Sequence, residues 1–154
     1  MQFAAPHPVL EQLAVLDGRW EIEAMHQAFH GTVIRGEAVF ETVRSGVLMT
    51  WHSHYDHPDI PDAVTILSGD ETGDLRNPGG GCAMHYYDER GVTRLFSLDA
   101  EPGVWRYWRN APGFSQRFTG RFSLDATTIE GVVELCRDGS TWEQDLAITY
   151  RRTS

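Results

Sequence analysis

The chain has 154 residues and a formal net charge of −9, from 13 basic and 22 acidic side chains. This length predicts a single domain over residues 1–154 that can bury a hydrophobic core. The negative charge argues against nucleic acid or an anionic membrane as a partner. No apolar run approaches the roughly 18 residues of a membrane span, and no signal-peptide pattern opens the chain. With two cysteines and no Cys-x-x-Cys pair, we expect a cytoplasmic protein with buried, reduced thiols.

One helix is predicted near the N-terminus, because apolar residues recur at helical spacing over 8–17, where Pro8 can begin the helix and Gly18 can end it. The rest of the chain alternates between short strands and Gly, Pro, Asn or Asp turns. A longer loop is expected over 69–81. The expected strands span 19–26, 32–43, 47–55, 63–68, 82–88, 92–98, 103–109, 115–122, 127–137 and 141–151.

About ten short strands joined mostly by hairpins favour an all-β fold, a single up-and-down antiparallel barrel with a short N-terminal helix. A β-sandwich is the alternative. Alternation of apolar and polar residues assigns the faces, so the first strand should turn Trp20 inward. The same rule turns Gln116 and Gln144 inward. Buried amides need hydrogen bonds, so this pair indicates either satisfied core amides or a cavity that holds water or ligand.

Three segments carry a resemblance to a known group of proteins. Leu16-Asp-Gly-Arg-Trp20, the run 111–122 and the final strand 142–150 resemble an uncharacterised bacterial family of calycin-like barrels, similar in shape to lipocalins and nitrobindins. The resemblance spans nearly the whole chain and implies a calycin-like barrel, but it implies no activity, because the family has no agreed one. Val133 stands where that family has Trp, which implies a larger cavity here.

Cofactors are not expected from this resemblance. A nitrobindin-like haem needs a histidine as its axial ligand on the last strands. The inward positions that we assign to the last strand hold Gln144 and Leu146 and no histidine.

The segment Thr50-Trp-His-Ser-His-Tyr-Asp-His57 raises the question of a metal site. His52 and His54 share one face of a strand, close enough to reach one ion, but zinc needs three or four ligands. Trp51 and Ser53 form the more apolar face, which predicts that both histidines point outward. Two alternatives stay open: His54 contacts a ligand near the open end, or the pair serves a metal or haem protein.

The sequence favours binding of a small apolar or aromatic molecule in the barrel cavity, without a cofactor. The alternative is a cofactor-independent isomerase, cyclase or lyase in which His26, at the end of the first inward face, acts as acid or base with a nearby carboxylate. No catalytic residue is assigned, and a homodimer is left open. The predicted ligand-binding residues are His26, Trp51, Ser53, His54, Met84, Tyr86, Trp105, Tyr107, Gln116, Phe118, Val133, Gln144 and Leu146.

Overall fold

The structure is a computed structural model that describes residues 5–26, 28, 31–69 and 81–154. Helix α1 spans Pro8–Leu13, and every expected strand is present close to its expected bounds. The expected loop 69–81 lies, apart from its two ends, outside the described residues. The strands are β1 Gly18–His26, β2 Ile34–Val43, β3 Leu48–Tyr55, β4 Ala63–Gly69, β5 Cys82–Asp88, β6 Thr93–Glu101, β7 Val104–Arg109, β8 Ser115–Phe122, β9 Thr128–Cys136 and β10 Trp142–Arg152.

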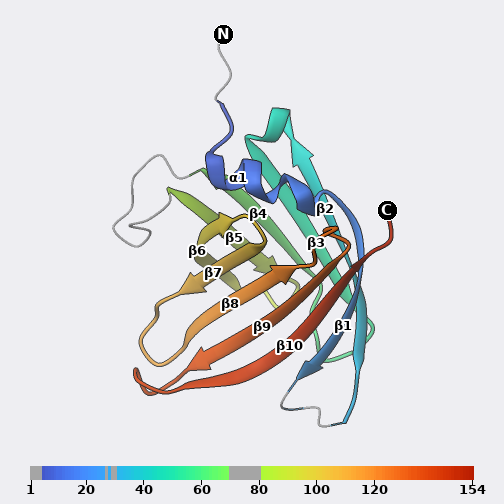
Figure 1. Cartoon of the computed structure of the whole chain (residues 1–154). Helices are drawn as coiled ribbons and strands as arrows, with labels where there is room; N and C mark the ends of the chain where they lie inside the picture. Colours follow the sequence, from blue (N-terminus) through green and yellow to red (C-terminus); the bar gives the residue numbers. More distant parts are fainter. Residues whose placement is uncertain (1–4, 27, 29–30, 70–80) are drawn as a thin grey trace.

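These strands form a closed antiparallel barrel in which each strand pairs with its neighbours along the chain and β1 also pairs with β10 (Figure 1). Ile22 marks the closure, since it lies opposite Gly36 on β2 and Tyr150 on β10. Hairpin connections suit this order, because antiparallel neighbours can be joined by short turns. The predicted all-β up-and-down barrel is confirmed, and the sandwich alternative is wrong. Among the described helices, none has the length and apolar character of a membrane span.

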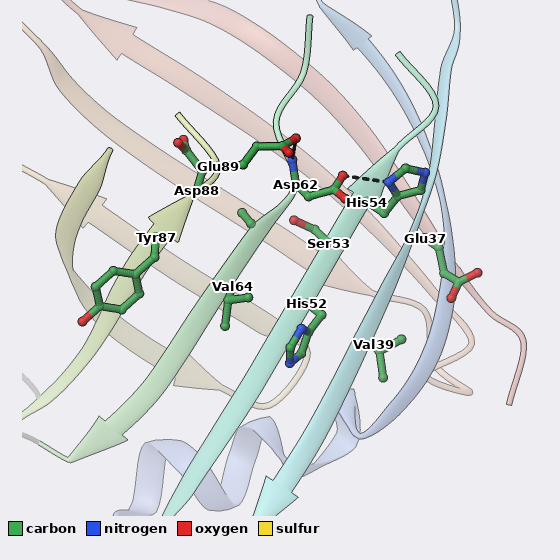
Figure 2. Close-up of a pocket in the computed structure, with 11 residues that line it drawn as sticks. Glu37, Val39, His52, Ser53, His54, Asp62, Val64, Tyr87, Asp88 and Glu89 are labelled. Carbon is green, nitrogen blue, oxygen red and sulfur yellow. Dashed lines mark hydrogen bonds and ion pairs between the residues drawn. The ribbon is translucent and has the colours of Figure 1, made fainter. Parts of the chain in front are cut away.

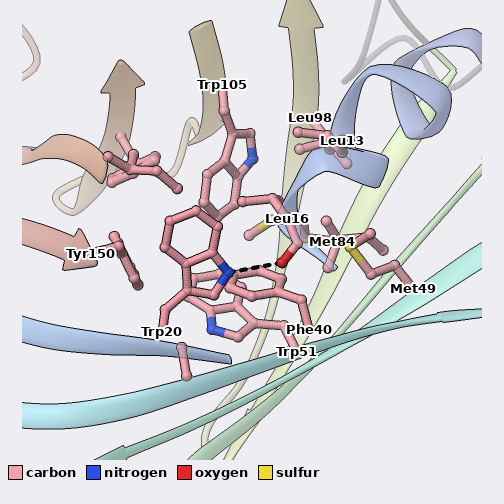
Figure 3. Close-up of a cluster of buried hydrophobic side chains, with 14 of the residues drawn as sticks. Leu13, Leu16, Trp20, Phe40, Met49, Trp51, Met84, Leu98, Trp105 and Tyr150 are labelled. Carbon is pink, nitrogen blue, oxygen red and sulfur yellow. Dashed lines mark hydrogen bonds between the residues drawn. The ribbon is translucent and has the colours of Figure 1, made fainter. Parts of the chain in front are cut away.

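Helix α1 covers one end of the barrel (Figure 1). It begins at Pro8 as predicted, but it ends at Leu13 and tightens into a 3₁₀ turn over Ala14–Leu16. The indole N–H of Trp20 on β1 donates to the carbonyl oxygen of Leu16 at 2.8 Å (Figure 3). The side chains of Leu13 and Leu16 are buried. The helical segment is therefore a plug that is fixed to the first strand.

The inner face of the barrel follows the predicted alternation over most strands. Trp20 is fully buried, and Met49 and Trp51 on β3 are buried while His52 beside them is exposed. The rings of Phe40, Trp51 and Trp105 pack together near the plug (Figure 3), with Trp51 and Trp105 centroids 5.4 Å apart. This aromatic cluster fills the plugged half of the barrel.

Two glycines on the inner face make room for a single aromatic ring. The ring of Phe118 lies against Gly120 and Gly131, and a Cβ atom on Gly131 would come within 2.5 Å of Phe118 Cε2. The same Cβ would lie 2.9 Å from Ile148 Cγ2. On its other side, Phe118 stacks on Tyr107 with 4.7 Å between the ring centroids. Phe118 is thus held in place from both sides.

Strand β10 departs from strict alternation at a β-bulge. Gln144 lies opposite Glu134, yet Leu146 lies opposite the very next residue of β9, Val133, so Asp145 is an extra residue. The bulge shifts the alternation, because two residues on one strand then face one on its partner. The prediction that Gln144 points inward is therefore wrong: Gln144 is exposed, and Asp145 lines the interior.

We expect Gly131→Ala to lower the free energy of unfolding by about 1–3 kcal/mol, because the new methyl group would press on a ring with no room to retreat. Urea denaturation measures this difference. The matched control is Gly69→Ala in β4, where the nearest atoms to a new Cβ are 3.9 Å away. Equal unfolding midpoints for the two variants would contradict this account of how Phe118 is held.

Candidate functional site

The barrel interior is left unfilled toward the end opposite α1, where a cavity of about 220 Å³ remains. Side chains from β3, β5, β7, β8 and β10 form most of its wall, and Ile60 and Pro61 reach it from the connection between β3 and β4. The aromatic residues of the wall include Trp51, Tyr55, Tyr86, Tyr107, Phe118 and Tyr150. The cavity is thus an aromatic-lined pocket in the half of the barrel that the plug does not fill.

Several hydrogen-bond donors in this wall have no acceptor in the part of the chain that the structure describes. The buried indole N–H of Trp51 has no partner there, and neither do the hydroxyl groups of Tyr55, Tyr107 and Tyr150. Burial raises the pKa of all three phenols well above the usual range, and neighbouring tyrosines, Tyr86 among them, add to the shift. They stay protonated at neutral pH, so the cavity presents donors rather than anions.

Tyr86 differs from these phenols because its hydroxyl is bonded. It donates to Asp88 Oδ2 at 2.8 Å, and the Arg90 guanidinium binds the same oxygen through Nη2 at 2.6 Å and Nε at 3.1 Å. Burial, with the Asp88 carboxylate, raises the pKa of Tyr86 to about 12. The hydrogen bonds from Arg90 hold the pKa of Asp88 well below its usual range. This network fixes Tyr86 near the open end and neutralises Arg90.

Two further arginines line the cavity and differ in their partners. Arg117 forms a two-pronged ion pair with Glu134, with N–O distances of 2.9 and 3.2 Å. Arg94 instead donates from Nη1 to the Gln116 side-chain oxygen at 3.2 Å. Among the described residues, no carboxylate oxygen lies within 4.0 Å of an Arg94 guanidinium nitrogen, the distance that defines an ion pair.

The bulged residue Asp145 meets the histidine at the end of β1. His26 Nε2 lies 3.1 Å from Asp145 Oδ1, and His26 Nδ1 accepts the backbone N–H of Ala28 at 3.0 Å. Because Nδ1 accepts, the ring proton of a neutral His26 is on Nε2 and is donated to the carboxylate. Asp145 lines the cavity and His26 does not, so the group exposed to a ligand is the carboxylate.

A separate hollow of about 650 Å³ lies on the outer wall, over β2–β5, and contains His52, His54, Val64 and Tyr87 (Figure 2). It opens to solvent more widely than the interior cavity does. His54 contacts Asp62 at 2.7 Å through Nδ1 (Figure 2). The prediction that both histidines point outward is confirmed, so the placement of His54 in the cavity wall is wrong, because Trp51 and Ser53 take the inward positions.

The described residues of these two hollows do not supply the ligands that a metal ion or a haem needs. Across 5–26, 28, 31–69 and 81–154, no group of three or more His, Cys, Asp or Glu side chains is arranged to hold a metal ion. The described wall of the interior cavity contains no histidine, and a haem barrel needs one as axial ligand. The described residues therefore do not fit either group.

The structure brings nine of the thirteen predicted site residues together: Trp51, Ser53, Met84, Tyr86, Tyr107, Gln116, Phe118, Val133 and Leu146 line the interior cavity. Trp105 is fully buried and packs beneath Trp51 and Phe118. His26 lies behind Asp145, and His54 and Gln144 are on the outer face.

The sequence-based prediction did not include several residues of this wall, among them Tyr55, Tyr150, Arg94 and Asp145. Tyr55 and Tyr150 fall on faces that alternation turns inward. The pattern therefore predicts their orientation, although neither was assigned to the ligand-binding residues. Arg94 shares the alternation of buried Phe96 on β6, which also could have found it. Asp145 had no such signal, because a bulge of one residue leaves no periodic trace.

Comparisons with known proteins support the fold. No family model matches the chain, and no curated protein matches it. The crystal structure of Rv2717c from M. tuberculosis is similar, with a TM-score of 0.64 and 13% sequence identity over 97% of this chain and 100% of that one. At this identity the likeness shows the fold alone, since one fold hosts many functions.

The His54 contacts lead to a prediction about pH. The hydrogen bond to Asp62, with a smaller effect of Asp56, raises the pKa of His54 above 6.5. Folding therefore favours the protonated ring, so this stabilisation is present below pH 6.5 and is lost as the pH rises through the raised pKa.

An NMR titration of the imidazole protons should give a pKa that falls toward the ordinary value in Asp62→Asn. The exposed Asp59→Asn makes the same charge change nearby and should leave the His54 pKa unchanged. An equal pKa in the wild type and in Asp62→Asn would show that the ion pair is absent in solution.

Proposed function

We propose that this barrel binds a small apolar or aromatic molecule in the interior cavity. The observation that supports it most strongly is that aromatic walls and hydrogen-bond donors without acceptors among the described residues share one cavity. The hydroxyl groups of Tyr55, Tyr107 and Tyr150 are these donors. A buried donor left without a partner costs about 1–3 kcal/mol, and a ligand with an acceptor would recover that free energy.

The wall also favours flat ligands. Tyr107 stacks on Phe118 and meets Phe96 edge-on, with ring centroids 4.7 and 5.2 Å apart. Aromatic ligands extend such offset and edge-to-face contacts. The volume of about 220 Å³ lies below the range of about 300–1,000 Å³ that holds drug-sized molecules. The expected ligand is therefore one or two fused rings with few substituents.

Filling the cavity should abolish binding. We expect Val133→Trp to place an indole in the cavity and to lower the affinity for aromatic ligands at least about tenfold, measured by ligand-induced thermal shifts and calorimetry over an aromatic fragment set. Val132→Trp is the control, because Val132 is 37% exposed on the outer face. Unchanged affinities in Val133→Trp, with the fold intact by circular dichroism, would exclude the interior as the binding site.

A second candidate function is favoured by the bulge at Asp145. The bulge turns a carboxylate into an apolar cavity, and the His26 N–H holds that carboxylate at 3.1 Å. Such a pair can take a proton from a bound substrate, with Asp145 as the base and His26 as its positioning residue. This supports a cofactor-independent isomerase or lyase, with Asp145 rather than His26 as the group that meets substrate.

Nitrobenzisoxazole tests this second candidate, because removal of its ring C–H proton breaks the N–O bond and releases a coloured cyanophenolate. We expect turnover above that of free acetate and a loss of about 10²-fold or more in Asp145→Asn, in line with general-base contributions. Glu143→Gln, an exposed change two residues away, should keep the wild-type rate. Equal rates in all three proteins would rule out Asp145 as a base.

A further inference from the structure

We propose that the ligand of this cavity is a small aromatic acid, whose carboxylate binds the Arg94 guanidinium while its ring lies against the aromatic wall. This inference rests on the proposed binding function and adds the chemical class of the ligand. It starts from the charges of the wall.

Two of the three arginines around the cavity are paired with carboxylates. Asp88 neutralises Arg90, and Glu134 neutralises Arg117. Arg94 alone among the three cavity arginines has no carboxylate partner in the described part of the chain. Arg94 is half-buried, and a charge that is removed from water normally needs a partner of opposite charge.

The surroundings of Arg94 hold it toward the cavity and leave most of its donors available. Gln116 accepts from one guanidinium nitrogen at 3.2 Å, and the Phe114 ring lies 5.4 Å from the guanidinium carbon. A guanidinium carries five N–H donors in a planar fork, and a fork binds a carboxylate through two parallel hydrogen bonds. The contacts to Gln116 and Phe114 orient the fork without occupying it.

The position of Arg94 on β6 connects this fork to the aromatic wall. Arg94 precedes the inward Phe96 by two residues and lies directly opposite Tyr86 on β5. An acid held by Arg94 can therefore extend its ring toward Phe96 and Tyr107, whose ring centroids are 5.2 Å apart. Asp145 repels an anion, so the acid group should lie at Arg94 and away from Asp145.

Two isosteric probes test the inference directly. β-Naphthoate and β-naphthamide have the same ring system, and only the first carries a negative charge. Calorimetric titration of the full chain should show at least about tenfold tighter binding of the naphthoate, as expected for charge-assisted hydrogen bonds. Arg94→Gln should lose that preference and keep its affinity for the amide. Arg94→Lys should retain part of the preference for the naphthoate over the naphthamide, because a point charge then replaces the planar guanidinium fork.

The control is Arg121→Gln, which removes an exposed arginine from the outer face of β8 and should bind both probes like the wild type. Circular dichroism and melting temperature verify that each variant is folded. Equal binding of the two probes in the wild type, or a preference that survives Arg94→Gln, overturns the role of Arg94 while binding itself stands. Failure of both probes and of the aromatic fragment set to bind the wild type overturns the proposed function together with this inference.

Discussion

Pairing of β1 with both β2 and β10 is the constraint on which the rest of this structure depends. Closure removes the free sheet edges and creates an interior that side chains must fill. About eight strands already enclose as much space as side chains fill, and this barrel has ten. One end is filled by the plug and by the aromatic cluster around Trp51 and Trp105. The space that remains at the other end is the cavity.

The plug and the closure strands are held together at one point. Trp20 on β1 donates to Leu16 in the plug, and the Arg152 guanidinium from β10 lies 4.2 Å from the centre of the Trp20 ring. Arg152 also donates to the carbonyl oxygens of Asp17, at 2.8 Å, and Val15. The first strand, the last strand and the helical segment thus share one contact. This contact joins the plug to both closure strands at one end of the barrel, and the opposite end is the place where a ligand could enter.

The chemistry of the open half is set by a small number of departures from a uniform apolar interior. The bulge in β10 replaces Gln144 by Asp145 on the inner face, and Asp145 is then bonded by His26. Arg94 supplies a cation at the start of β6, and the tyrosines supply donors that burial keeps protonated. Together these groups make a cavity that has aromatic walls and in which Arg94 and Asp145 supply opposite charges.

Much of this could be read from the sequence, because strands in a barrel alternate strictly between one buried and one exposed face. That rule correctly placed Trp51, Tyr107, Phe118 and Val133 on the inner face. It also correctly turned Ser53 inward and His54 outward. It failed at Gln144, because a one-residue bulge reverses the faces without altering composition.

Charge pairing could not be read in the same way. Whether Arg94 or Arg117 has a carboxylate partner depends on which strands become neighbours and in which register. Glu134 reaches Arg117 only because β8 and β9 pair those two residues. The proposal of a ligand class therefore needed the three-dimensional arrangement, whereas the barrel itself could be predicted from the sequence.

The most direct test of the account is the NMR signal of the Trp51 indole N–H during titration with aromatic fragments, because the Trp51 side chain lines the cavity and its N–H has no acceptor among the described residues. The account predicts a saturable shift of that signal, with matching shifts at Val133 and Leu146. Shifts confined to the outer wall near His52 and Tyr87, or no shift with any fragment, would contradict the claim that the interior is a binding site.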